Sequence, residues 1–175
     1  MPKTIKMTLN PQSIDRAIAE LQSYSKSLET KLALIVQRLA DLGLTVASAG
    51  FESAIYDGVN DVAVSIEDKG ATHKAVVAVG TAVIFIEYGS GCYYPDTHPQ
   101  KPDGIVGRGE YGKGHGKQNT WGYYGEAGTN GVEITNHSGK KVVLTHGNPS
   151  NPIMYNSKEA MRQAIQEIVR EVFSQ

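Results

Sequence analysis

The sequence predicts a single α+β domain, and three observations lead to that class. A helical period runs along residues 11–42, an alternating period follows over residues 45–88, and a second helical period occupies residues 157–173. The chain has 175 residues, of which 40% are hydrophobic and 20% charged, so it is long enough and apolar enough for one core. We therefore expect a long N-terminal helix packed on a small antiparallel sheet of about four strands.

The first expected element is the helix over residues 11–42. Asn10 and Pro11 suit its N-cap and first turn, and Gly43 suits a C-cap. At about 1.5 Å per residue this helix would be about 48 Å long, more than a small sheet can cover. Two interpretations follow: a core helix laid across the sheet and bent near residues 24–27, or an intermolecular coiled coil. Its apolar residues recur at spacings of four and three, interrupted by Ser25: Ile14, Ile18, Leu21, Leu28, Leu32, Ile35, Leu39 and Leu42.

An antiparallel meander is expected next, with strands near residues 45–53, 61–67, 72–79 and 82–88. Val62, Val64 and Ile66 alternate with small or polar residues, and turns are expected at residues 68–70 and 80–81. The last strand is apolar on both sides, since Ile84 and Phe85 would point to opposite faces. One helix covers only one of those faces, so we expect the other to contact a neighbouring subunit.

Residues 89–150 form an extended insertion by composition. They hold 14 of the 19 glycines, five of the nine tyrosines and the only tryptophan. A segment this long with few aliphatic residues is typical of a functional loop. Within it, residues 132–135 and 141–144 flank a turn and predict one hairpin. After it, Asn156 and Glu159 resemble a capping pair at the start of the helix over residues 157–173.

No catalytic, cofactor-binding or metal-binding residue is predicted. The pattern Gly107-x-Gly109-x-x-Gly112 follows no credible strand, and residues 114–117 lack the other residues of a phosphate loop. Cys92, Asp96 and His98 give only a weak match to the ligand spacing of structural zinc. A metal-dependent enzyme that uses the histidine-rich insertion remains an alternative.

Charge and hydropathy bear on the partners. The net charge is −1, and the insertion has six Lys or Arg against five Asp or Glu, so neither sequence-specific nucleic acid nor an anionic membrane is expected. Residues 1–6 lack the apolar run of a signal peptide, no stretch approaches about 20 apolar residues, and the single cysteine fits a reducing compartment, so we expect synthesis in the cytoplasm. Trp121, Tyr123 and Tyr124 predict a protein contact surface, with glycan binding as the alternative.

Two short phrases give the chain a resemblance to a known family. Residues 83–91, VIFIEYGSG, end an apolar segment before the insertion, and residues 148–155, NPSNPIMY, precede the last helix. In this order the phrases resemble those of the neck and tail-completion (head–tail joining) proteins of long-tailed bacteriophages, although the insertion here is longer and richer in Gly and Tyr.

The resemblance implies a non-enzymatic structural protein of a phage or prophage virion, made in the host cytoplasm. Its subunits would form a closed ring that contacts portal or head-completion proteins and tail proteins. The residues expected at those contacts are Phe85, Glu87, Tyr88, Trp121, Tyr123 and Tyr124. Glu87 has two interpretations: a partner for a neighbour's Lys or Arg, or a solvated carboxylate at a strand end.

Overall fold

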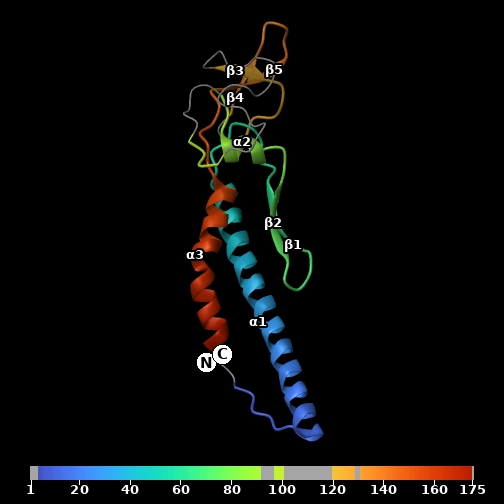
Figure 1. Cartoon of the computed structure of the whole chain (residues 1–175). Helices are drawn as coiled ribbons and strands as arrows, with labels where there is room; N and C mark the ends of the chain where they lie inside the picture. The colour runs from blue at the N-terminus through green and yellow to red at the C-terminus, as the bar shows by residue number, and fades with distance from the viewer. Residues whose placement is uncertain (1–3, 92–96, 101–119, 129–130, 175) are drawn as a thin grey trace.

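The fold is α+β, with a long N-terminal helix, two small antiparallel sheets and a C-terminal helix (Figure 1). The computed structural model describes residues 4–91, 97–100, 120–128 and 131–174. Helix α1 spans Pro11–Glu52, α2 spans Val83–Tyr88 and α3 spans Ile153–Ser174. Strands β1 (Ala63–Asp68) and β2 (Lys74–Val79) pair as a hairpin, while β3 (Trp121–Tyr123), β5 (Lys141–Thr145) and β4 (Val132–Thr135) form the second sheet in that spatial order.

Helix α1 is the axis of an elongated molecule. Figure 1 shows α3 along one side of its C-terminal half, the β1–β2 hairpin along another side, and the three-stranded sheet beyond its C-terminal end. Its start is as the sequence predicts, because the Asn10 side chain accepts a hydrogen bond from the Ser13 N–H at 2.8 Å and Pro11 occupies the first turn. Its end is not at Gly43, since the helix continues to Glu52.

The predicted strand over residues 45–53 is therefore wrong, and small residues explain why this segment stays helical. A Cβ added at Gly43 would lie 2.6 Å from Met161 Sδ and 3.0 Å from Val76 Cγ2, so α3 and the hairpin both approach α1 there. The Ser157 hydroxyl also donates to the Gly43 carbonyl at 2.8 Å. Gly43 thus permits close packing inside the helix and does not terminate it.

The predicted strand over residues 82–88 is also wrong, because residues 83–88 form helix α2. Asp61 fixes the turn that leads into this helix, because its carboxylate accepts hydrogen bonds from the N–H groups of Thr81 and Ala82, at 2.8 and 2.9 Å; the N-cap residue Ala82 itself has no capping side chain. Short apolar runs fit a buried strand or a buried helix equally well by periodicity. Ile84, at 48% exposed, and half-buried Phe85 therefore do not lie on opposite faces of a strand.

The core lies where the end of α1, helix α2 and the start of α3 meet. Its buried members are Ala47, Phe51, Ala82, Ile86 and Ile153, and the hairpin adds half-buried Val62, Val64, Val76 and Ala78. Of the meander, only the two strands of this hairpin exist among the described residues, while the predicted hairpin in the insertion is confirmed as β4 and β5. Helix α3 begins at Ile153, four residues before the predicted start, so Asn156 and Glu159 do not cap it.

Candidate functional site

The two phrases that carry the family resemblance contact each other at the junction of α2 and α3. Ser90 and Asn148 form an antiparallel bridge, and the Asn151 N–H donates to the Ile86 carbonyl at 2.9 Å. The Asn148 side-chain amide donates to the Phe85 carbonyl, and the Ser150 hydroxyl donates to the Glu87 carbonyl, each at 2.8 Å. These bonds join residues more than 50 positions apart into one structural unit, which we call the α2–α3 junction.

Glu87 lies at the centre of this junction and is 4% exposed. Its Oε2 accepts a hydrogen bond from the Met154 N–H at 2.8 Å, and its Oε1 accepts one from the Tyr155 N–H at 3.1 Å. Both donors belong to the first turn of α3, which contains no acidic residue of its own. The carboxylate therefore caps α3 from a distant part of the chain and lies at the positive end of its dipole.

His98 supplies the third hydrogen bond to Glu87. Its Nε2 lies 3.1 Å from Glu87 Oε1, and its Nδ1 accepts the Gln100 N–H at 3.0 Å. Because one ring nitrogen accepts, the proton of the neutral imidazole is on Nε2, which donates to the carboxylate. Both side chains are almost fully buried, at 3% and 6% exposed. Glu87 is therefore neither a solvated carboxylate nor a group in need of a neighbour's cation.

Aromatic rings enclose His98 on two sides. Its ring centroid lies 4.3 Å from that of Tyr88 and 6.1 Å from that of Tyr155. Burial, and then the charge of Glu87, raise the pKa of Tyr88, so this phenol stays neutral at physiological pH. The Lys158 ammonium donates to the Gln100 side-chain carbonyl at 3.0 Å and lies 4.4 Å from the centre of the Tyr155 ring. Residues 97–100 are thus attached to the start of α3 by several contacts.

The predicted contact residues Trp121, Tyr123 and Tyr124 lie on or beside β3, next to the junction. A Cβ at Gly91 would overlap the half-buried Trp121 ring, which places that ring against the end of the first phrase. Tyr124 is 71% exposed, and its hydroxyl accepts from the Asn136 side-chain amide at 3.3 Å. The three residues therefore divide: Tyr124 faces solvent, and the other two are half-buried.

Tyr123 carries a buried hydroxyl with no hydrogen-bond partner in the described part of the chain. Burial, and then Asp57, raise its pKa, while burial followed by Tyr123, Asp61 and Asp57 raises the pKa of Tyr56. The Thr145 hydroxyl donates to the Asp57 carboxylate and accepts the Gly147 N–H, the latter at 2.8 Å. These groups hold the loop before β1 against the three-stranded sheet, and the tyrosines are neutral at physiological pH.

The described residues offer little for catalysis or metal binding. Within the described ranges, no three His, Cys, Asp or Glu side chains are grouped so that they could hold a metal ion. The predicted Cys92 and Asp96 and both glycine motifs at residues 107–117 lie outside the described residues. One hydroxyl–imidazole pair is present, Thr120 Oγ1 and His146 Nδ1 at 2.8 Å, and it lies on the exposed surface.

Helix α1 is more apolar than the expectation of no membrane-spanning stretch allowed. Over 18 residues its mean hydropathy is 1.4, and by length and composition alone it could cross a membrane. In this structure 22% of that stretch is buried, and the C-terminal half of α1 packs on α3 and the hairpin. Comparison of the chain with protein-family models, curated proteins and solved structures finds no match.

Sequence reasoning selected Glu87 and Tyr88 but missed His98 as their partner. The histidine was considered only as a metal ligand, whereas the structure uses it as a hydrogen-bond donor to Glu87. No sequence signal pointed to this role, because the helix was expected to start at residue 157 with Glu159 in its first turn, whereas α3 starts at Ile153 and has no acidic residue there.

Proposed function

We propose that the chain is a structural virion protein of a phage or prophage, a ring-forming neck or tail-completion subunit that joins head and tail. The observation that carries the proposal is the α2–α3 junction. The two phrases that resemble the family pack together through Glu87, Asn148 and Ser150, so each has a structural reason to accompany the other.

The surface of the molecule supports an assembly role. Large apolar side chains with more than a third of their surface exposed occur before and along α1, on α2, on α3 and on the three-stranded sheet: among them Leu9, Ile18, Leu21, Leu32, Ile84, Val132 and Phe173. Single exposed apolar side chains are normal, but Ile14, Ile18 and Leu21 lie on one face of α1, and a contiguous apolar surface marks a contact. Because residues 83–88 form a helix, the contact surface expected on a doubly apolar strand is replaced by two exposed side chains, Ile84 on α2 and Tyr124 after β3.

The chemistry of the junction favours a non-enzymatic role. The three donors to Glu87 engage both of its oxygens, so this buried carboxylate is not poised as a general base. The expected partners are further copies of the chain, portal or head-completion proteins and tail proteins. Neither a membrane nor a specific nucleic-acid sequence is among them, and the protein would be made in the host cytoplasm.

The test is complementation of a phage or prophage that lacks the gene. We expect particles without the protein to accumulate unjoined heads and tails, and wild-type protein to restore joining. Alanine at exposed Tyr124 should leave the monomer folded and reduce joining, whereas alanine at exposed Gln12, at the far end of the molecule, serves as the matched control. Normal particles without the protein would contradict the proposal.

The enzyme alternative rests on the Thr120–His146 pair and has its own test. Hydrolase activity of purified protein that is lost in Thr120→Ala, or about one zinc per chain that survives dialysis and is lost in His146→Ala, would favour it. Glycan binding that is lost in Trp121→Ala would favour a tail module instead.

A further inference from the structure

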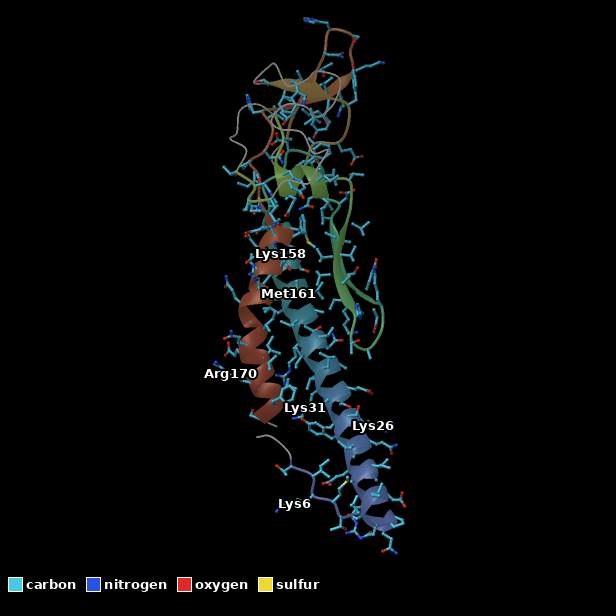
Figure 2. The ribbon with its side chains drawn as sticks, viewed as in Figure 1. Lys6, Lys26, Lys31, Lys158, Met161 and Arg170 are labelled. Carbon is cyan, nitrogen blue, oxygen red and sulfur yellow. The ribbon has the colours of Figure 1, made fainter. Side chains whose placement is uncertain are left out.

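The N-terminal part of α1 extends beyond α3 and the β1–β2 hairpin, and only the segment that precedes the helix is drawn beside it (Figure 1). Among residues 11–30 only Ala17 is buried, and Ser13 and Leu28 are half-buried. Helix α3 ends beside Lys31, whose ammonium donates to the Val172 carbonyl at 3.0 Å, and Figure 2 shows Lys31 at that end while Lys26 lies past it. We call residues 11–30 the arm.

One side of the arm carries a continuous apolar stripe. Ile14, Ile18 and Leu21 are 37%, 48% and 55% exposed, and half-buried Leu28 continues the line after Ser25. The spacing of four, three, four and three residues is that of the core positions of a coiled coil. These five residues are the arm seam.

We propose that the arm seam pairs with the arm seam of a second copy of this chain, parallel and in register. The inference rests on the proposed function only in that both require copies of the chain to associate; the arm pair has two-fold symmetry and is separate from the contacts that would close a ring. It requires no head or tail partner.

The seam continues an interface that the chain already uses. Farther along α1, the same heptad positions are occupied by Leu32, which is 47% exposed, and then by buried Ile35 and half-buried Leu39 and Leu42, in the half of the helix that packs on α3 and the hairpin. Within the chain, α3 and the β1–β2 hairpin therefore cover the C-terminal half of α1. A second α1 supplies the equivalent partner for the arm.

Ser25 fixes the direction and register of the pair. It is the one polar residue of the seam, and the parallel in-register alignment places it against its own counterpart. Antiparallel alignments pair each core position with the other kind of core position, so Ser25 would face a leucine such as Leu21 or Leu28. Those alignments place a hydroxyl against an apolar side chain, so the two Ser25 hydroxyls no longer face each other.

The charges beside the seam favour the same alignment. Asp15 and Glu29 occupy equivalent flanking positions, one residue after a core position. In the antiparallel alignment that overlaps the two arms fully, these carboxylates face each other and repel. In the parallel alignment Asp15 faces Asn10 and Glu29 faces Tyr24, so no like charges meet.

Disulfide trapping tests the pairing directly. The full chain carries Cys92→Ser together with either Leu21→Cys in the seam or Ser23→Cys on the opposite side of the helix as the matched control. On mild oxidation we expect Leu21→Cys to form a covalent dimer at least about tenfold faster than Ser23→Cys. Equal rates, or no dimer from Leu21→Cys, would overturn the proposal, and trapping captures even short-lived pairs.

Two further measurements distinguish the parallel pair from an antiparallel pair and from lipid binding. A mixture of Leu21→Cys and Ser25→Cys chains should give mainly like-with-like dimers, and a predominance of the mixed dimer would show an antiparallel pair and overturn the proposal. Flotation of purified protein with phosphatidylglycerol vesicles, abolished by Leu21→Glu and accompanied by no trapping, would make lipid the occupant and also overturn it. Failed trapping with intact head–tail joining refutes this inference alone.

Discussion

Glu87→Ala tests whether the buried carboxylate holds the α2–α3 junction together. The change removes the acceptor of three donors: the Met154 and Tyr155 N–H groups and His98 Nε2. Hydrogen bonds to a charged group contribute about 1.5–3 kcal/mol each, and loss of a helix cap costs about 1 kcal/mol. Because these terms overlap, we expect the free energy of unfolding to fall by about 3–5 kcal/mol, a large part of a total of about 5–15 kcal/mol.

The measurement is urea unfolding at pH 7 followed by circular dichroism. Glu87→Gln keeps the size of the side chain but loses the charge and turns one acceptor into a donor, so its expected loss is about 1–3 kcal/mol. Glu133→Gln is the matched control. Its side chain is 40% exposed beside Lys141, so its effect should stay within about 0.5 kcal/mol.

A double-mutant cycle assigns part of the effect to His98. The variants Glu87→Ala, His98→Ala and their combination should show a coupling of about 0.5–3 kcal/mol, since the two side chains share one hydrogen bond in a buried site. If Glu87→Ala unfolds within about 0.5 kcal/mol of the wild type, the capping argument is wrong.

Three further changes probe other parts of the account. Gly89→Ala should destabilise the fold by about 1–2 kcal/mol in urea unfolding, because φ is +75° and the added Cβ would lie 2.6 Å from the Ser150 nitrogen; an unchanged midpoint would contradict this. Gly43→Val should lower the free energy of unfolding by about 1–3 kcal/mol or more through overpacking. Ala49→Val, on the exposed side of the same helix, should lower it by less than half as much, and thermal unfolding measures both. Hydrogen bonds from Thr81 and Ala82 lower the pKa of Asp61 from 3.8 to about 2, so between these pH values the unfolded chain binds more protons than the folded chain. The free energy of unfolding should therefore fall as the pH drops through this window, and it should fall less steeply in Asp61→Asn. Equal slopes for the two proteins would contradict the role of Asp61.

The fold class follows from periodicity, but the lengths of the elements do not. The start of α1 at Asn10 and Pro11 and the hairpin of β4 and β5 are set by local signals, and both were predicted correctly. The predictions for Gly43 and for residues 82–88 were wrong for the same reason, because contacts with distant residues decide the structure at both places. Met161 and Val76 explain the glycine, and Asp61 fixes the turn that leads into α2.

The candidate site shows the same division. Sequence reasoning could select Glu87, because the carboxylate sits in an apolar phrase, but it assigned the wrong surroundings. Its partners are backbone N–H groups of α3 and an imidazole 11 positions away, and neither pairing has a spacing rule that a single sequence reveals. Long-range capping of this kind becomes visible only once the helices are placed.

The central claim, a subunit that joins head and tail, is tested most directly by electron microscopy of particles made without the protein. The account predicts filled heads and separate tails, with joining restored by wild-type chain and with density for a ring of this subunit at the neck of restored particles. Joined particles of normal yield without the protein, or restored particles that contain none of it, would contradict the account.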